Sequence, residues 1–347
     1  MQKKVLAVIF GGYSTEYEVS LQSACAVLEN LDAEKYEVIP IGITRQGDWF
    51  RYRGSLERIK DGTWSRDSRH LVPVVISQNR KQPGMLELGE NEIKPMRLDL
   101  AFPVLHGKNG EDGTVQGLFE LAGIPVAGCG LLSSALCMDK DLAHRLVKEA
   151  GIAVPKSITL WPWTMAGLHE KAKSLTYPLF VKPARAGSSF GITKIYREMQ
   201  LEAAVKFAFE HDGKAVVEES VDGFEVGCAV LGRGELLVGR VDEIELADGF
   251  FDFTEKYTLK TSQIHMPARI DAACEKRIQK TAKKIYRALG CSGFARVDMF
   301  LKPTGEIVFN EVNTIPGFTS HSRYPNMMKG IGLSFGELLD RLLGLYL

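Results

Sequence analysis

The chain has 347 residues, 45% of them hydrophobic and 25% charged, values typical of a soluble globular protein with two or three domains. Basic and acidic side chains number 43 each, so the formal net charge is zero and nothing predicts a nucleic-acid or membrane partner. No apolar run approaches the ~18 residues that span a membrane.

The cysteines and the N-terminus both favour a cytoplasmic protein. The six cysteines are scattered, with no C-x-x-C pair, and several stand in apolar runs, which predicts buried free thiols in a reducing compartment. The apolar run at residues 5–10 could imitate a signal peptide. However, Gly11 and Gly12 end it at once and acidic residues follow, so we do not interpret it as one.

The first 128 residues alternate strand-like and helix-like segments. Residues 5–10 are a continuous apolar run, typical of a buried parallel strand, and we expect further strands at 36–44 and 98–106. A helix is expected to begin within residues 11–20, capped by Ser14 or Thr15, and to end near residue 31. The alternation predicts an α/β domain with a doubly wound parallel sheet.

Two features of this segment are candidates for ligand binding. Glu16 could meet a cation such as the ammonium group of an amino acid, or it could simply offset the helix dipole. Residues 106–117 contain four glycines and several polar groups, which indicates a ligand-binding loop at the edge of the sheet. His106 stands at the strand end, where a histidine is more often a structural hydrogen-bond partner than a catalyst.

The middle segment, residues 129–217, has a pattern that suits phosphate binding. Residues 133–150 have helical periodicity, with Leu136, Ala143, Leu146 and Val147 on one side. An extended run at 177–183 contains Lys182 and leads into a Gly/Ser-rich loop at 184–191, which can cradle phosphates, although flexible linkers look similar.

Residues 215–221 are predicted to form a strand that turns polar at its end. Such a segment can be a hinge that offers backbone groups to an adenine, with Glu225 just beyond it for the ribose hydroxyls. The alternative for these glutamates is ordinary surface charge.

The last segment, residues 218–347, begins with a predicted hairpin of strands 224–231 and 236–246. Residues 248–260 are aromatic yet charged and have no clean period, which suits a lid over a site. Helices are expected at 272–289 and 334–345.

A second hairpin, of strands 293–301 and 306–317, carries the strongest chemical signal. A turn at 302–305 predicts that Leu301 faces Glu306, that Asp298 faces Phe309 and that Arg296 faces Glu311. Alternation then places four polar side chains on one face: Arg296, Asp298, Glu311 and Asn313. The opposite face carries apolar side chains: Val297, Met299, Leu301, Val308 and Val312. Asn310 falls among the apolar positions without an explanation.

The polar face has the ingredients of a metal site. Two carboxylates and an amide oxygen are ligands that Mg²⁺ takes together with nucleotide phosphates. Arg296 beside them can stabilise a developing negative charge. The alternative is a solvated sheet face with one cross-strand ion pair, worth less than ~1 kcal/mol.

Together these motifs resemble the D-alanine–D-alanine ligase family of ATP-grasp enzymes over almost the whole chain. The resemblance is carried by GGYSTEYEVS at 11–20, LHGKNGEDGTVQG at 105–117, MDK at 138–140, VKPARAGSSFG at 181–191, EES at 218–220 with Glu225, EKY at 255–257, ARVD at 295–298 and NEVNTIPGFTSHSRYP at 310–325. It implies an N-terminal domain at 1–128, a central ATP-grasp lobe with the phosphate loop at 129–217, and a C-terminal lobe with the lid and metal site at 218–347.

The resemblance also implies roles for individual residues. Glu16 would bind the ammonium of the first D-amino acid and join Ser188 and Tyr257 in closing the lid. Binding of ATP would fall to Lys140, Lys182, Ser189, Glu218, Glu219, Val221, Glu225 and Lys256. Two Mg²⁺ (or Mn²⁺) ions would be held by Asp298, Glu311 and Asn313. The oxyanion would be stabilised by Arg296 and the Gly317 amide, and the second substrate's carboxylate by Ser322.

Within the family, the chain is similar to the vancomycin-resistance, Van-type branch. Its substrate loop has Arg323 after Ser322, where housekeeping members usually have an apolar residue, and its E-K-Y lid is intact, unlike that of D-lactate-adding members. Arg323 with Phe251 resembles the D-alanine–D-serine ligases, and His106 is placed with them as a residue expected to shape specificity.

The expected reaction is ATP-dependent joining of D-alanine to D-serine, for peptidoglycan precursor synthesis and vancomycin resistance. An ordinary D-alanine–D-alanine ligase and a nucleotide-binding regulatory protein without catalysis are the alternatives. The family's habit implies a homodimer.

Overall fold

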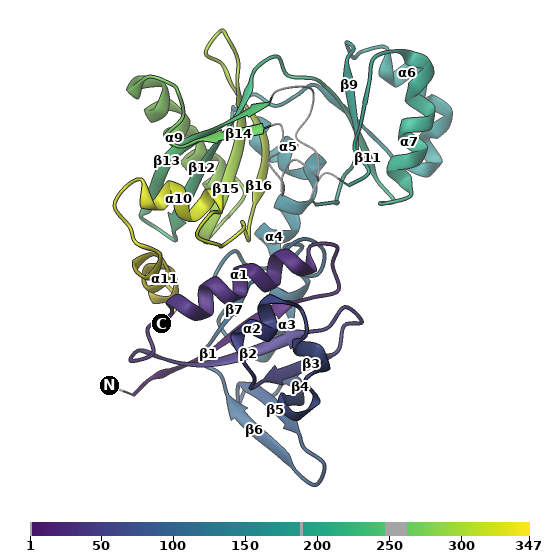
Figure 1. Cartoon of the computed structure of the whole chain (residues 1–347). Helices are drawn as coiled ribbons and strands as arrows, with labels where there is room; N and C mark the ends of the chain where they lie inside the picture. The colour runs from purple at the N-terminus through teal and green to yellow at the C-terminus, as the bar shows by residue number, and fades with distance from the viewer. Residues whose placement is uncertain (1, 188–189, 247–261) are drawn as a thin grey trace.

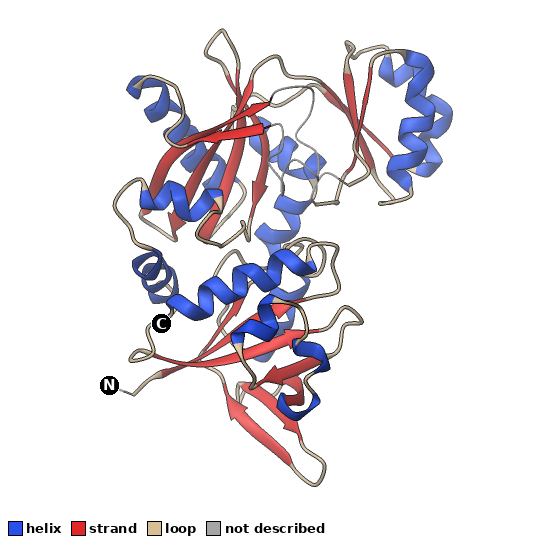
Figure 2. Ribbon diagram, viewed as in Figure 1, coloured by secondary structure: helices blue, strands red, loops and turns tan. Residues whose placement is uncertain are grey.

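The chain folds around three β-sheets, which Figure 1 colours by residue number and Figure 2 by secondary structure. The computed structural model describes residues 2–187, 190–246 and 262–347. The N-terminal sheet lies at the bottom of the view, and the other two lie side by side above it, with a pair of helices between them.

The N-terminal sheet has seven strands, and its parallel part is the predicted one. Strand β1 (Lys4–Gly11) lies between β2 (Tyr36–Ile43) and β7 (Leu100–Pro103), and both pairs are parallel. Four antiparallel strands then extend the sheet beyond β2: β3 (Trp49–Tyr52), β4 (Leu71–Ser77), β5 (Gly84–Leu88) and β6 (Ile93–Arg97). They are absent from the prediction because their patterning is poor; in β6, for example, four of the five side chains are exposed.

Both faces of β1 are covered, as the doubly wound prediction requires. Leu6, Val8 and Phe10 pack with helix α1 (Tyr17–Asn30), whereas Ala7 and Ile9 pack with helix α3 (Thr114–Ala122) on the opposite face. The short helix α2 (Leu56–Lys60) lies beside α1. The fold class predicted from the alternating pattern is therefore confirmed.

The beginning of α1 differs from the prediction. Glu16, not Ser14 or Thr15, is the N-cap residue, and no side chain caps the first turn. Ser14 instead accepts a hydrogen bond from the Glu16 backbone (3.1 Å) and donates to the His106 carbonyl (2.9 Å). These bonds hold the Glu16 backbone beside the glycine-rich loop.

The other two sheets face each other across the upper part of the molecule (Figure 1). The four-stranded sheet has the order β10-β9-β11-β8, with β8 (Ser157–Leu160), β9 (Leu179–Pro183), β10 (Thr193–Ile195) and β11 (Ala215–Glu219). Helices α6 (Leu168–Ala172) and α7 (Leu201–Phe209) contribute to its apolar core. The phosphate loop predicted after Lys182 follows directly from β9.

The five-stranded sheet has the order β14-β13-β12-β15-β16. Its strands are β12 (Phe224–Gly232), β13 (Leu236–Leu246), β14 (Ser262–His265), β15 (Gly293–Leu301) and β16 (Ile307–Asn313). Helix α9 (Ala272–Ala288) packs on one face, and α10 (Arg323–Lys329) packs on the other, near α11 (Phe335–Gly344). Helix α10 is absent from the prediction; the predicted hairpin of β12 and β13 and the predicted helices α9 and α11 are present.

The single helix predicted for residues 133–150 is wrong. The chain forms α4 (Leu131–Met138) and α5 (Lys140–Glu149), separated at Asp139, which has an extended backbone. The Asp139 carboxylate accepts a bond from Leu142 N (3.1 Å) and pairs with the buried Lys214 (2.8 Å), and these two interactions favour a cap over a continuous helix. The break makes Lys140 the first residue of α5.

Two further expectations concern the whole chain. All six cysteines are buried and free, as predicted. Among the described residues, none of the helices combines the length and the apolar character that a membrane span requires.

Candidate active site

The hairpin of β15 and β16 has a register different from the predicted one. Asp298 lies opposite Glu311 and Arg296 opposite Asn313, whereas Met299 lies opposite Phe309. The prediction is displaced by one residue at the turn, where Leu301 pairs with Ile307, and by a second residue at a β-bulge between these pairs. Asn310 is the extra residue of the bulge, which explains its place among apolar neighbours.

The bulge also decides which side chains share a face. Between the turn and the bulge the displacement is odd, so Val308 leaves the core face and Phe309 takes its place in the apolar core with Val297 and Met299. Beyond the bulge the displacement is even, so the polar set predicted for the opposite face stays together: Arg296, Asp298, Glu311 and Asn313.

Asp298 lies at the centre of this polar set and is almost fully buried. Arg296 donates to the Asp298 carboxylate from Nε (2.8 Å) and Nη2 (2.7 Å), and Asn313 Nδ2 donates to Asp298 Oδ2 (2.8 Å). Burial disfavours the charge on Arg296, but the Asp298 carboxylate outweighs burial and raises the pKa of Arg296. The cation is therefore fixed beside the site.

Two cavities meet at this hairpin. The first, of about 620 Å³, lies between the N-terminal sheet's loops and the five-stranded sheet, and it is lined by predicted substrate and oxyanion residues: Glu16, His106, Arg296, Gly317, Ser322 and Arg323. We call it the amino-acid cavity. Asn313 also lines it, whereas Asp298 is not among the described residues that line either cavity.

The second cavity, of about 750 Å³, lies between the four-stranded and five-stranded sheets, and it is lined by predicted nucleotide residues: Lys182, Glu218, Glu219 and Val221. We call it the nucleotide cavity. Four residues line both cavities: Lys140, Ala186, Glu225 and Glu311. A group bound in one cavity can therefore reach a group bound in the other at Lys140 and Glu311.

Charged side chains of the nucleotide cavity are already arranged around each other. The Lys182 ammonium bonds Glu218 Oε1, and although burial alone would raise the pKa of Glu218, Lys182 lowers it. Among the described residues, Glu218 Oε2 has no hydrogen-bond partner although it is buried, so it remains an acceptor for a ligand. Lys140 Nζ donates to the Ala186 carbonyl (3.0 Å) and lies 3.8 Å from Glu311 Oε2.

Glu111 is a site residue that the sequence reasoning missed, although it stands in the G-E-D-G part of the glycine-rich loop. Its carboxylate accepts bonds from Gly107 N (2.9 Å) and Ile315 N (3.0 Å). Glu111 thereby joins the glycine-rich loop to the loop that follows β16, residues 314–322, which we call the substrate loop. Burial and the neighbouring Glu16 carboxylate raise the pKa of Glu111 to about 8, against the opposing effect of the two backbone donors.

His106 also connects the glycine-rich loop to the substrate loop. Its Nδ1 lies 2.8 Å from the Ile315 carbonyl, which can only accept, so Nδ1 carries a hydrogen. Its Nε2 lies 2.9 Å from Ser23 Oγ, and Ser23 in turn accepts from Phe318 N (3.2 Å). Burial lowers the pKa of His106, which favours the neutral ring that accepts the Ser23 hydrogen. Both ring nitrogens are thus engaged in positioning residues 315–318.

Arg323, at the beginning of α10, lines the amino-acid cavity, and its main partner was not predicted. It bonds Asp242 of β13 through Nε (2.7 Å) and Nη2 (2.8 Å), and Glu225 through Nη1 (3.1 Å). Asp242 is fully buried. Burial opposes the charge on Arg323, but Asp242, Asp298 and Glu225 together raise its pKa well above the ordinary value. Asp242 stands among other charged residues of β13, namely Arg240, Glu243 and Glu245, so its pairing with Arg323 had no distinct sequence signal.

Ser322 and Gly317 lie together at the end of the amino-acid cavity. Ser322 Oγ accepts from Thr319 N (3.0 Å) and lies 2.8 Å from Thr319 Oγ1. A Cβ atom built on Gly317 would come within 3.1 Å of Ser322 Oγ, so glycine allows this close approach. The predicted residues Ser188, Ser189, Phe251, Lys256 and Tyr257 lie outside the described residues.

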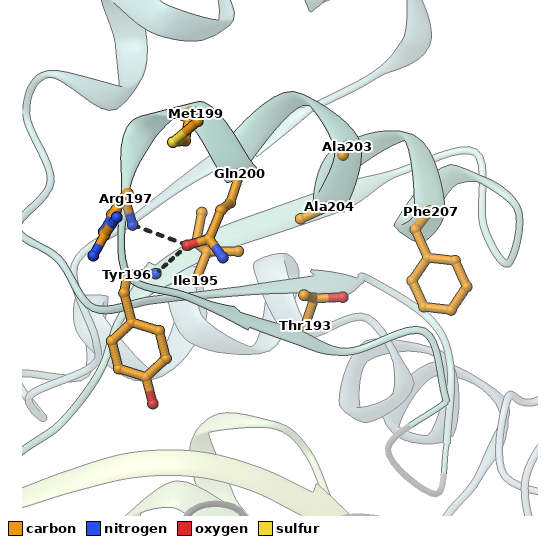
Figure 3. Close-up of a pocket in the computed structure, with 9 residues that line it drawn as sticks. All are labelled: Thr193, Ile195, Tyr196, Arg197, Met199, Gln200, Ala203, Ala204 and Phe207. Atoms are coloured by element: carbon orange, nitrogen blue, oxygen red, sulfur yellow. Dashed lines mark hydrogen bonds between the residues drawn. The ribbon is translucent and has the colours of Figure 1, made fainter.

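A third hollow, of about 880 Å³, lies on the outer surface of the four-stranded sheet between β10 and α7 (Figure 3). Tyr196, Met199 and Phe207 line it, as does Gln200, whose Oε1 accepts bonds from the backbone N–H groups of Tyr196 and Arg197. Of the predicted site residues that the structure describes, none lines this hollow.

Comparisons with known proteins agree with this arrangement. The models "D-ala D-ala ligase N-terminus" and "D-ala D-ala ligase C-terminus" match residues 5–129 and 146–344. The crystal structure of the VanG D-Ala:D-Ser ligase from Enterococcus faecalis is 66% identical, with a TM-score of 0.94 and complete coverage of both chains.

Two curated relatives extend the comparison. The vancomycin B-type resistance protein VanB of Enterococcus faecalis is 47% identical over 350 residues, covering 99% of each chain. A D-alanine–D-alanine ligase of Caldicellulosiruptor bescii is 42% identical over 351 residues, covering 99% of this chain and 95% of that protein. The predicted ATP-grasp fold and the resemblance are both confirmed. The chain belongs to the D-alanine–D-alanine ligase family, and it is an ATP-dependent ligase.

Proposed function

We propose that this enzyme joins D-alanine to D-serine through a D-alanyl phosphate, for peptidoglycan precursors that confer vancomycin resistance. The observation that carries the proposal is that the amino-acid and nucleotide cavities meet at Lys140 and Glu311, beside the Arg296–Asp298 pair. The titles of VanG and VanB support the choice of substrate and the biological setting.

ATP is proposed to occupy the nucleotide cavity. Glu218, Glu219 and Val221 lie at the end of β11, where backbone and carboxylate groups can receive the adenosine, and Glu225 can take the ribose hydroxyls. Lys182 lines the nucleotide cavity and Lys140 lines both cavities, and these lysines can offset the charge of the phosphates. For Ser189 and Lys256 the same role is a proposal from the resemblance.

The first D-alanine is proposed to bind with its ammonium at Glu16 and its carboxylate towards Lys140 and Glu311, the junction where the two cavities meet. Glu16 is buried in the wall of the amino-acid cavity beside Gly107 and Gly187, whose missing side chains leave room for its carboxylate. Closure of the site by Glu16, Ser188 and Tyr257 is likewise proposed from the resemblance.

Metal ions are proposed to bind at the junction of the two cavities, beside Glu311. Within the described residues, no group of three or more His, Cys, Asp or Glu side chains is arranged to hold a metal. Glu311 lines both cavities and Asn313 lines the amino-acid cavity, whereas Asp298 lies opposite Glu311 with its carboxylate bonded to Arg296 and Asn313. This set therefore supplies few ligands and leaves the rest to phosphate oxygens. We propose that these three residues hold two Mg²⁺ (or Mn²⁺) ions, which offset negative charge on the transferring phosphoryl group.

The chemistry then follows in two displacements. A carboxylate oxygen of D-alanine attacks the γ-phosphorus of ATP, and the bond to the β-phosphate oxygen breaks, which gives the acyl phosphate and ADP. The free amine of the second amino acid attacks the acyl carbon, the C–O bond to phosphate breaks, and the nitrogen loses a proton. Arg296 and the Gly317 N–H are proposed to stabilise the oxyanion of this second step.

The second substrate is proposed to be D-serine, with its carboxylate at Ser322 and its hydroxyl at Arg323. A guanidinium has five N–H donors, and the bonds to Asp242 and Glu225 use three of them. A further N–H of Nη1 can therefore donate to a hydroxyl in the amino-acid cavity. A pocket built to bond a hydroxyl rejects the methyl analogue strongly, because its own polar group is left unpaired. Phe251 is proposed to shape the same pocket, and His106 to support it through the loop at 315–318.

One observation favours the alternative substrate, a second D-alanine. Arg323 is already held by Asp242 and Glu225, so part of its hydrogen-bonding capacity is satisfied without any ligand. If the remaining donor faces water, the pocket discriminates little between D-serine and D-alanine.

Three organisational features remain proposals. The chain is proposed to divide at residues 128/129 and 217/218, with the N-terminal sheet in the first segment and the five-stranded sheet in the last. The second boundary falls within β11 (Ala215–Glu219), so the end of the four-stranded sheet extends into the last segment. A homodimer and a cytoplasmic location are proposed from the resemblance and from the free cysteines.

The direct test of ligase activity is phosphate release from ATP and Mg²⁺ with D-alanine and D-serine, followed by separation of the dipeptides. Dipeptide formation coupled to phosphate release is expected. Nucleotide binding without any phosphate release would favour a regulatory protein and overturn the proposal.

A further inference from the structure

The carbonyl of Asn310 is the unusual backbone group of the site. A bulge leaves its extra residue outside the regular ladder. On the outer edge of β16, the described backbone contact is the isolated bridge at Val308, where Phe309 N donates to the Ala153 carbonyl (2.9 Å). A buried carbonyl without a partner is unfavourable. The partner here is a side chain: His144 Nε2 lies 2.9 Å from Asn310 O.

Burial and packing orient the His144 ring for this contact. It is buried in α5, and its ring packs edge-on against Phe309, the neighbour of Asn310, with centroids 5.5 Å apart. The Asn310 carbonyl can only accept, so Nε2 must carry the hydrogen. Among the described residues, the other nitrogen, Nδ1, has no hydrogen-bond partner. The ring is therefore oriented by the single bond to Asn310 and by its packing.

The same helix reaches the next residue of β16 one turn earlier. Lys140 and His144 are four residues apart, so they lie on one face of α5. Lys140 Nζ lies 3.8 Å from the Glu311 carboxylate, while His144 holds the carbonyl of the preceding residue. Helix α5 thus contacts the bulge at two adjacent points, one at the backbone and one at the side chain that lines both cavities.

We propose that His144 is a positioning residue: its Nε2–H bond to Asn310 fixes the β-bulge that places Glu311 opposite Asp298, and thereby sets the affinity for the divalent cation at the junction. A bulge that relaxes into a regular ladder would shift β16 by one residue and send Glu311 to the core face. The proposal rests on the proposed Mg²⁺-dependent function, and it gives α5 two roles, since Lys140 faces the phosphates and His144 secures the ligand strand.

The test compares His144→Leu, which keeps apolar volume but loses the donor, with His144→Gln, whose amide can replace Nε2–H. Lys148→Gln, an exposed position on the same helix, is the matched control. Binding of Mn²⁺ is measured by electron paramagnetic resonance in the presence of a non-hydrolysable ATP analogue. Supporting groups behind metal ligands typically contribute about 10-fold or more to affinity, so we expect about a tenfold loss for Leu and less than about threefold for Gln.

Kinetics provide a second readout. In His144→Leu the Mg²⁺ concentration for half-maximal rate should rise by a similar factor, while the KM for D-alanine stays near the wild-type value. Mn²⁺ affinity of the Leu variant within about twofold of wild type would overturn the inference while leaving the proposed function intact. Failure of the wild type itself to bind Mn²⁺ with the nucleotide would instead remove the proposed function.

A measurement on the wild type keeps the inference testable if His144→Leu does not fold. Nitrogen-15 chemical shifts of the His144 ring report which nitrogen carries the hydrogen. The Nε2–H tautomer is expected, and the Nδ1–H tautomer would contradict the proposed bond to Asn310.

Discussion

Arg323, which lines the amino-acid cavity, forms a bidentate ion pair with Asp242, with Nε 2.7 Å from Oδ2 and Nη2 2.8 Å from Oδ1. The pair joins the beginning of α10 to β13, so the position of the guanidinium is determined before any substrate arrives. The pair is proposed to orient the group that selects the second amino acid.

Gly227 of β12 makes the pair possible. A Cβ built on Gly227 would lie 2.3 Å from Arg323 Nη2 and 2.6 Å from Asp242 Oδ1. Gly227→Ala should therefore displace Arg323 and reduce the ratio of D-serine to D-alanine incorporation by about tenfold or more, because the hydroxyl would lose its donor. Gly234→Ala in the β12–β13 turn, where a Cβ meets nothing within 4 Å, is the control. Equal product ratios in the two variants would argue against Arg323 as the selector.

Removal of the buried carboxylate should affect stability as well as selection. Asp242→Asn removes the buried partner of Arg323, and breaking one side of a buried ion pair typically costs about 3–5 kcal/mol of unfolding free energy. We expect a loss near the lower end of that range, since Glu225 still pairs with Arg323. Urea denaturation provides the measurement. A change smaller than about 1 kcal/mol would mean that the pair is not anchored as the structure indicates.

If Glu311 and Asn313 hold the metal ions, replacing either should lower kcat strongly, whereas replacing Glu306 should not. Glu311→Gln and Asn313→Ala should each lower kcat by about 100-fold or more, because metal stabilisation contributes several kcal/mol and each 1.4 kcal/mol is tenfold. Glu306→Gln, at the turn end of the same hairpin and paired with Lys302, should leave kcat unchanged. Circular dichroism checks that all three variants fold. Near-normal turnover of the first two at limiting Mg²⁺ would exclude them as ligands.

Glu111 predicts a proton linkage on substrate binding. With a raised pKa of about 8, the carboxyl is about nine-tenths protonated at pH 7 in the free enzyme. A substrate ammonium beside Glu16 and Glu111 favours the ionised form, so binding of D-alanine should release a proton, and affinity should rise as pH increases from 6 to 8. Calorimetry in buffers of different ionisation enthalpy measures this release. In Glu111→Gln the buffer dependence should disappear; persistence there would assign the proton to another group.

Ser23 tests the support of the substrate loop. Ser23→Ala removes the hydroxyl that bonds His106 Nε2 and accepts from Phe318 N, and leaves two buried polar groups without a partner. Since one such group costs about 1–3 kcal/mol, we expect kcat to fall by roughly tenfold with little change in the KM for ATP. Ser134→Ala removes an equally buried hydroxyl of α4 and serves as the control. A parallel loss in both variants would indicate a general packing effect.

The sequence allowed the polar face of the β15–β16 hairpin to be predicted although its register was wrong. Alternation has a period of two, so two single-residue displacements, one at the turn and one at Asn310, restore the face on which Glu311 and Asn313 lie. Val308, between the two displacements, was assigned to the wrong face for the same reason.

Residues whose role depends on distant partners could not be predicted. Asp139 breaks a helical pattern because Lys214, far along the chain, pairs with it. Asp242 and Ser23 look like ordinary strand and helix residues until Arg323 and His106 are placed beside them. Local periodicity carries no information about such contacts, whereas the lysines and carboxylates of short motifs were visible because their chemistry is local.

The proposed choice of D-serine as the second substrate is tested most directly by a competition experiment with the wild-type enzyme. Equal concentrations of D-alanine and D-serine are supplied with ATP and Mg²⁺, and the two dipeptides are separated and quantified. A ligase that selects D-serine through Arg323 should yield mostly D-alanyl-D-serine, and Arg323→Met should shift the product towards D-alanyl-D-alanine. Mostly D-alanyl-D-alanine from the wild type would contradict the proposed second substrate.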